Sequence, residues 1–147
     1  MKFINVDITK YSKISHDILY SEDDTIMYAK FSGNYGIGSL GNADGTYIFS
    51  TLASYYFAYE TITIILDLTD LEYSWGNTIL KSLNFFEEIG RDEFEKEQLM
   101  IIVCSQNNQE AIGNLLKFSS RGHRFLCLDK NVAIETALKY VKDYLDE

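Results

Sequence analysis

The fold of this chain is decided by the stretch Thr61-Ile-Thr-Ile-Ile-Leu-Asp-Leu68. It is β-branched and almost continuously apolar, which is typical of a strand covered on both faces. Two further apolar runs follow, at Leu99–Cys104 and Phe125–Leu128. Each of the three runs is followed by a segment with apolar residues at helical spacing, at 77–95, 107–118 and 131–145. These repeated strand–helix units predict parallel strands joined by helical crossovers.

Polar residues indicate where these helices begin. Asn77 is expected to cap the first helix, and the last is expected to begin near Asn131. Asn107, with Glu110 three residues later, fits a capping box in its Asn form. The charged end of the first helix, Glu87–Glu97, is predicted to be a solvated helix face or, alternatively, a surface that steers a basic partner.

The front of the chain predicts antiparallel strands. Ile14–Tyr20 and Thr25–Ser32 flank the turn-like residues Ser21–Asp24. Phe3–Ile8 also alternates apolar and polar residues, which predicts a strand, although the pattern leaves open whether Met1–Lys13 joins the sheet. Residues 1–24 are therefore a possible N-terminal strand extension of the domain.

Glycines mark the loosest part of the chain. Five of the nine glycines fall between Gly33 and Gly45, which predicts a loop. Asp44 is expected to cap a helix that runs to about Glu60. With 147 residues the chain has the length of about one domain. We therefore expect one α/β domain over 1–147, with a mixed, mostly parallel sheet and helices packed on it.

The charge of the chain restricts its partners. Thirteen basic residues against 22 acidic ones give a net charge of −9. This charge argues against binding to nucleic acid phosphates or anionic membranes, and it suits a basic protein partner. No secretory signal or apolar run long enough to span a membrane is visible, so we expect a cytoplasmic protein. Cys104 and Cys127 lie in apolar runs and are expected to be reduced core thiols.

The residues Ile64-Ile-Leu-Asp-Leu-Thr-Asp-Leu-Glu-Tyr73 resemble a STAS domain, the family of bacterial anti-sigma-factor antagonists and of sulfate-transporter tails. That family has an apolar strand ending in Leu-Asp-Leu-Ser, followed by a loop and a helix. The similarity in the order of elements extends over about 25–147. The resemblance implies a STAS-like α/β fold and a non-enzymatic domain that binds other proteins through this loop and helix.

The phosphorylation switch of that family is not reproduced here. Its Asp-Ser-Ser-Gly motif corresponds to Tyr73-Ser-Trp-Gly-Asn-Thr78, which is about two residues shorter. Only Ser74 or Thr78 could accept a phosphate, and neither has the flanking Asp of the motif.

Gly36-Ile-Gly-Ser-Leu-Gly41 is a literal G-x-G-x-x-G that follows an expected strand. Glycines in this pattern let backbone amides approach a pyrophosphate. The expected helix begins only after the motif, and the chain has no room for a second nucleotide-binding half. We therefore favour a loop that contacts a partner protein and keep a small nucleotide-binding domain as an alternative.

Trp75, the only tryptophan, follows a buried strand of the predicted sheet. Loops at that end of open α/β sheets usually carry function, and Trp is a preferred binding anchor. Burial of the indole under the next helix is the competing interpretation. The predicted partner-binding residues are Tyr73, Ser74, Trp75, Gly76 and Asn77, with Leu40, Asn42 and Asp44 as a second edge.

No residue pattern points to catalysis. His16 and His123 lie far apart in sequence, and no Cys or His pair has the spacing of a zinc site. Asp67 and Asp70 could be paired carboxylates, but at a strand end such residues more often bind backbone amides. We expect no enzyme, cofactor or metal. A second hypothesis is an immunity protein that blocks a basic secreted toxin, motivated by charge alone.

Overall fold

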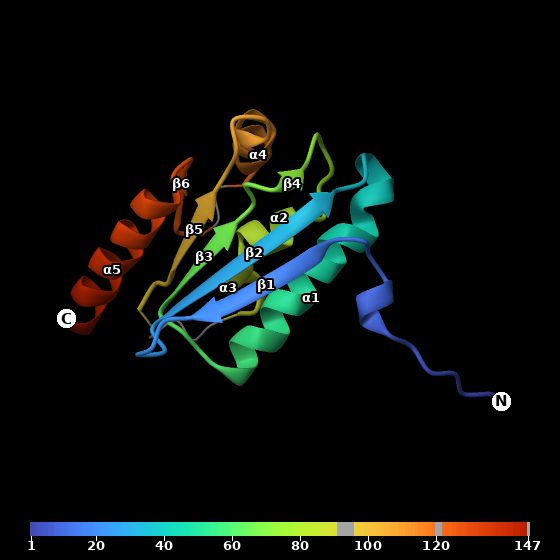
Figure 1. The fold of residues 1–147 in the computed structure, drawn as a ribbon, viewed down its shortest axis with the longest axis horizontal. Helices are drawn as coiled ribbons and strands as arrows, with labels where there is room; N and C mark the ends of the chain where they lie inside the picture. The colour runs from blue at the N-terminus through green and yellow to red at the C-terminus, as the bar shows by residue number, and fades with distance from the viewer. Residues whose placement is uncertain (91–95, 120–121, 147) are drawn as a thin grey trace.

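The computed structural model describes residues 1–90, 96–119 and 122–146. Its centre is one mixed sheet in the order β1–β2–β3–β5–β6, with β4 paired to the end of β2 (Figure 1). β1 is antiparallel to β2, and the other pairs are parallel, as the sequence predicts. The strands are β1 (Ser15–Tyr20), β2 (Ile26–Asn34), β3 (Thr63–Asp67), β4 (Leu71–Glu72), β5 (Leu99–Val103) and β6 (Arg124–Cys127).

Helices cover both faces of the sheet. The helices are α1 (Asn42–Ala58), α2 (Leu80–Leu83), α3 (Phe85–Glu88), α4 (Gln109–Leu116) and α5 (Lys130–Asp146), with short 3-10 turns η1 (Ile8–Lys10) and η2 (Gly38–Gly41). In the larger core cluster, the helices α1, α2, α3 and α4 pack on one face of the sheet. In the smaller cluster, α5 packs on the other face. The predicted single α/β domain architecture is confirmed. No helix of the described segments is long and apolar enough to cross a membrane.

β3 lies between β2 and β5 in the sheet, and both of its faces are buried. Ile64 and Leu66 belong to the larger cluster, and Ile65 points into the smaller one. On that second face α5 contributes Ala133 and Ala137, both fully buried. Their small side chains let the helix backbone lie close to the sheet.

The helix predicted over 77–95 is wrong as a continuous element. Two short helices, α2 and α3, replace it, and the chain breaks between them at Asn84. The buried amide of Asn84 donates to the Ser119 hydroxyl at 3.0 Å and accepts from the Arg124 guanidinium. Asn77, the predicted cap, is not the cap of α2, because Ile79 directly precedes the helix; the Asn77 backbone carbonyl accepts from the Leu80 amide. Residues 91–95, and with them much of the Glu87–Glu97 patch, lie outside the described residues.

The starts of two helices differ from the prediction. α4 is preceded by Asn108, one residue after the predicted cap Asn107. α1 begins at Asn42, so Asp44 lies in the first turn and not at the cap. The buried Asp44 carboxylate instead accepts from the Ser12 hydroxyl (2.6 Å) and the Gly36 amide (2.8 Å). These partners, which are distant in the sequence, hold the Asp44 side chain in the interior.

The predicted strand at Phe3–Ile8 is wrong. Residues 1–7 form an extended arm that leaves the body of the molecule (Figure 1). A strand needs a neighbour for its backbone groups, and no other described segment pairs with this one. The alternation of apolar and polar residues at Phe3–Ile8 is therefore present without a neighbouring strand in the described part of the chain.

Candidate functional site

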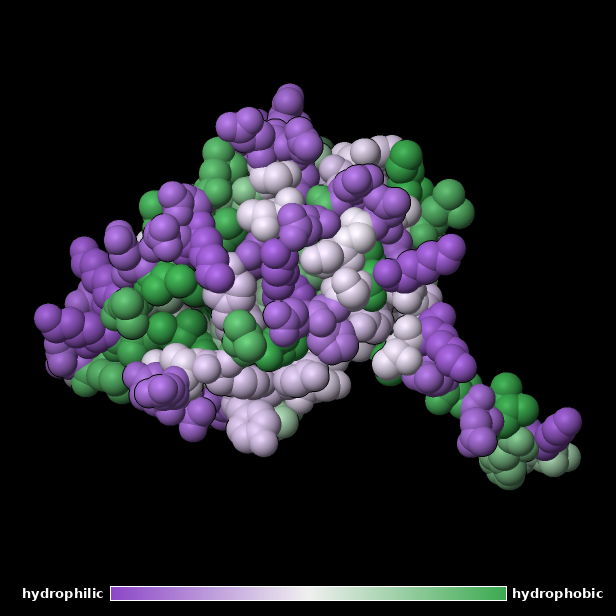
Figure 2. Space-filling view, viewed as in Figure 1, coloured by the Kyte–Doolittle hydropathy of each residue, from purple (hydrophilic) through white to green (hydrophobic). Residues whose placement is uncertain are grey.

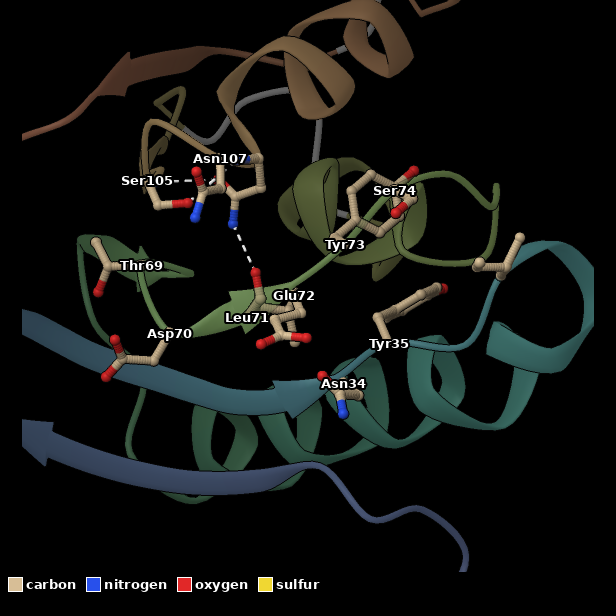
Figure 3. A pocket seen from close by; sticks show the side chains of 12 residues that line it. Asn34, Tyr35, Thr69, Asp70, Leu71, Glu72, Tyr73, Ser74, Ser105 and Asn107 are labelled. Atoms are coloured by element: carbon tan, nitrogen blue, oxygen red, sulfur yellow. Dashed lines mark hydrogen bonds between the residues drawn. The ribbon is translucent and has the colours of Figure 1, made fainter.

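A polar cleft of about 600 Å³ lies where the parallel strands end. β4 pairs with the last residues of β2 and extends the rim of this cleft. Figure 3 shows Ser105 and Asn107 on one wall, opposite Asp70 and Glu72. The lining residues are Asn34, Tyr35, Ile37, Thr69, Asp70, Leu71, Glu72, Tyr73, Ser74, Ser105, Asn107 and Asn108. The position is the one at which open α/β sheets usually bind ligands.

Asn108 ties together the loops that form the cleft. Its side-chain nitrogen donates to the carbonyls of Leu68 (2.8 Å) and Leu71 (2.9 Å). Its side-chain oxygen accepts from the Ser105 amide, and the Ser105 hydroxyl accepts from the Asn108 amide. Since Asn108 is 1% exposed, these bonds are shielded from water and hold the loops after β3 and β5 in one geometry.

Asp67 and Asp70 do not form a carboxylate pair, because each has its own partners. The Asp67 carboxylate accepts from the amide and hydroxyl of Thr69 and from the Tyr28 hydroxyl. Burial raises the pKa of Asp67, but these hydrogen bonds outweigh it and leave the pKa below its ordinary value. Asp70 is paired with Lys30 at 2.8 Å. The prediction that these carboxylates bind backbone groups is confirmed for Asp67 but not for Asp70, whose carboxylate pairs with Lys30.

The charge in the cleft favours cationic or hydrogen-bond-donating ligands. Asp70 and Glu72 are its ionisable carboxylates, and no Lys, Arg or His is among the described residues that line it. The Glu72 carboxylate has no ion pair within the described part of the chain. The remaining polar groups are amides and hydroxyls, so the cleft is suited to binding.

The structure brings the two predicted edges of the partner-binding surface together. The Gly38 amide donates to the carbonyl of Trp75 at 3.2 Å. The indole ring also covers Gly38 so closely that an added Cβ would lie 2.6 Å from it. The Thr78 hydroxyl donates to the side-chain oxygen of Asn42 at 2.7 Å. The loop after β4 and the glycine loop before α1 therefore form one continuous surface.

The eight predicted residues divide into exposed residues and buried residues. Trp75 is 61% exposed and Leu40 is 80% exposed, so both are available to a partner. Ser74, Asn77 and Asn42 are exposed as well.

Three of the predicted contact residues are buried in the structure. Tyr73 is 6% exposed, because its ring packs edge-on against Tyr35 and its hydroxyl donates to the Gly76 carbonyl at 2.7 Å. Gly76 and Asp44 are also buried. These three residues support the exposed ones from behind. Of the two candidate phosphate acceptors, Ser74 is exposed, whereas the Thr78 hydroxyl is engaged with Asn42.

A second groove, which the sequence did not indicate, lies between the Trp75 loop and α4. It has a volume of about 220 Å³ and is lined on the α4 side by Ala111, Asn114, Leu115 and Phe118. Phe118 is 86% exposed, just beyond the end of the helix. In the sequence, the only indication of this groove is an aromatic residue shortly after the helix pattern. The fold is needed to place Phe118 near Trp75.

The glycine motif at 36–41 packs against itself. An added Cβ at Gly36 would lie 2.5 Å from the Leu40 backbone, and one at Gly41 would lie 2.3 Å from the Gly36 carbonyl oxygen. The Gly36 amide already donates to the Asp44 carboxylate. An anionic phosphate would face that carboxylate, so this geometry argues against the nucleotide alternative.

Both cysteines are free thiols on opposite faces of the sheet; Cys104 is buried, as predicted, whereas Cys127 is only half-buried. Burial raises the pKa of Cys104 to about 12. No group of three or more His, Cys, Asp or Glu side chains is placed to hold a metal ion within residues 1–90, 96–119 and 122–146.

Comparison with known proteins shows a likeness of fold only. No family model and no curated protein matches the chain. The chain is similar to the crystal structure of an uncharacterized DUF3478-family protein with a SpoIIAA-like fold from Shewanella loihica PV-4. The two are 18% identical over 84% of this chain and 93% of the other, with a TM-score of 0.47. SpoIIAA-like is another description of the STAS-like fold.

Proposed function

We propose that this chain is a non-enzymatic protein-binding module that regulates or neutralises its partner. Its docking face consists of Trp75, Leu40 and Phe118 with the grooves beside them. The observation that carries the proposal is the exposed Trp75 indole, which is held against Gly38 by packing and by a backbone hydrogen bond. A large aromatic side chain that is both exposed and fixed loses little entropy when it binds.

The polar cleft supplies the specificity of this face. Its carboxylates favour a lysine or arginine of the partner, above all Glu72, which has no ion pair with any residue that the structure describes. Tyr73 and Ser74 line both the cleft and the groove beside α4, so one partner segment could occupy both. The expected partner therefore presents an apolar residue and a basic residue close together.

The same lining supports a binding role over a catalytic one. The cleft contains the hydroxyls of Ser74 and Ser105, but no histidine is among its described lining residues to activate either. Elsewhere, His16 faces the Tyr47 hydroxyl at 2.6 Å, away from these serines.

The second candidate function is an immunity protein for a basic toxin. The net charge of −9 and the acidic cleft favour it. The two functions differ in the identity of the partner, since a sigma-factor regulator or kinase supports the first and a toxin encoded next to this chain supports the second.

Affinity capture from lysate of the source cells tests the proposed face, with the partner identified by mass spectrometry. Trp75→Ala is expected to lose the captured partner, with binding weakened by about 2 kcal/mol or more in calorimetry. Phe57→Ala is the matched control, because Phe57 is an aromatic residue of similar exposure on α1. Equal capture by wild type and Trp75→Ala would remove this face from the proposal.

Measurement of the association rate with the partner tests the role of the cleft. The association rate with the captured partner is expected to fall as salt rises, and Glu72→Gln is expected to reduce both that rate and its salt dependence. Stopped-flow fluorescence of Trp75 is a suitable readout, since the chain has one tryptophan. A rate independent of salt would contradict a basic partner.

A further inference from the structure

The N-terminal arm carries exposed apolar side chains that nothing in the described structure covers. Phe3 and Val6 are each 88% exposed, and Ile4 is exposed too. Figure 2 shows the arm separated from the body, with apolar side chains near its end. Exposing so many apolar residues on a short extended segment is unfavourable in water unless they pack against another surface.

The sheet offers a matching surface at β1. This strand is at the edge of the sheet, and no described strand pairs with its outer side. It has six residues, about 20 Å of strand, and residues 1–7 of the arm span about 23 Å when extended. An unpaired edge of this kind readily accepts an additional strand.

We propose that the arm of one copy of this chain pairs with the edge of β1 in a second copy, antiparallel, and that the exchange is reciprocal. The arm points away from its own sheet (Figure 1). A second copy supplies the same edge to the arm, and a two-fold arrangement satisfies both arms at once.

The side-chain patterns of the two segments agree in an antiparallel register. Pairing Ile4 with Ile18 places Val6 beside His16, on the face of the sheet that α1 covers. Successive residues of a strand point to opposite faces. Phe3 then meets Leu19 on the other face, where Leu19 is 54% exposed.

Charge favours the same orientation. Residues 1–13 hold three lysines and one aspartate, in a chain with a net charge of −9. In the antiparallel register Lys2 lies beside the acidic turn Glu22–Asp24 of the other copy. Asp7 pairs with Ser15 of that copy, two residues from Lys13. A parallel arm would place Asp7 at the acidic turn, which like-charge repulsion disfavours.

Sedimentation equilibrium of the full chain tests the association. A dimer with a dissociation constant below about 1 mM is expected. Val6→Asp is expected to raise the dimer dissociation constant by more than about 100-fold, because each dimer contains two arms. Leu145→Asp, an equally apolar exposed site on α5, is the control and is expected to leave the constant unchanged.

Charge reversal tests the orientation. Lys2→Glu is expected to weaken the dimer by about tenfold, and Glu22→Lys in the same chain is expected to restore it. Lys142→Glu on α5 controls for the change in net charge.

Disulfide trapping tests the contact itself, in a Cys127→Ser background with oxidised glutathione. Phe3→Cys with Leu19→Cys is expected to form a cross-linked dimer, and Phe3→Cys with Leu138→Cys is not, although Leu138 is similarly exposed. A monomer at all concentrations, a Phe3–Leu19 link within one chain, or a Leu138 link of equal yield would each overturn the proposal. So would arm-dependent binding to phosphatidylglycerol vesicles without dimer formation.

Discussion

Asn108 is the residue whose side chain organises the candidate site. It donates to the carbonyls of Leu68, just after β3, and of Leu71, at the start of β4, and it accepts from a backbone amide in its own loop. Its neighbour Asn107 is exposed on the cleft wall. The two asparagines are adjacent in sequence, but only the buried one has a structural role.

Asn108→Ala is expected to lower the free energy of unfolding by about 2–4 kcal/mol, because the carbonyls of Leu68 and Leu71 lose their donor while remaining buried. Asn107→Ala is the control and is expected to change stability by less than about 0.5 kcal/mol. Urea denaturation followed by circular dichroism measures both. A similar loss in the two variants would contradict the assigned role of Asn108.

Asp67 predicts how stability depends on pH. Its pKa is lower in the folded state than in the unfolded chain, so its contribution is present above the unfolded value of about 3.9. That contribution is lost as pH falls through the lower folded pKa. Asp67→Asn is therefore expected to unfold with a shallower dependence on pH between about 5 and 2 than wild type.

Tyr28→Phe, which removes one of the donors to Asp67, is expected to give an intermediate dependence. Thermal unfolding midpoints across this pH range are the measurement. Identical slopes for wild type and Asp67→Asn would show that the hydrogen bonds to this carboxylate do not stabilise the fold.

At the scale of elements, the glycines of the loop between β2 and α1 serve packing. Gly41→Ala is expected to destabilise the protein by about 2–3 kcal/mol, because its Cβ would meet the Gly36 carbonyl and the Tyr35 ring at 2.3 Å. Gly113→Ala in α4 is the matched control, since an added Cβ there meets nothing within 4 Å. That substitution is expected to stabilise α4 by about 0.5–1 kcal/mol. Equal effects in urea denaturation would refute the packing role.

The sequence predicted most strongly those elements whose cause is local. β3 and β5 follow from runs of β-branched and apolar residues that suit a strand buried on both faces. The break between α2 and α3 could not be predicted in this way. Its cause is the contact of Asn84 with Ser119 and Arg124, which lie 35 and 40 residues later.

At the scale of the whole molecule, Cys104 reports the opening of the core. It is 1% exposed beside the carboxyl end of the sheet, and burial raises its pKa to about 12. In a Cys127→Ser variant, labelling of Cys104 by a thiol reagent at about pH 8 is expected to require global unfolding. Its labelling rate should then follow the urea dependence of unfolding. Rapid labelling without denaturant would show that this edge of the sheet opens locally.

The whole molecule also decides which predicted site residues a partner can reach. Trp75 and Tyr73 are two residues apart in one loop, and both are aromatic residues of the kind that anchors interfaces. Tyr73 is buried because its ring packs against Tyr35, whereas Trp75 packs on the outside of Gly38 and stays exposed. Only the tertiary structure makes this distinction.

The sequence by itself determined the strands β1, β2, β3, β5 and β6 and the parallel arrangement of β3, β5 and β6, because these depend on periodic apolar residues and on helical links long enough for a crossover. Tertiary structure alone decided which residues line the cleft and that Phe118 stands beside Trp75. It also decided that residues 1–7 remain unpaired despite a strand-like pattern. The physical reason is that burial and hydrogen bonding are properties of neighbours in space, and for these residues the neighbours lie tens of residues away or are missing from the single chain.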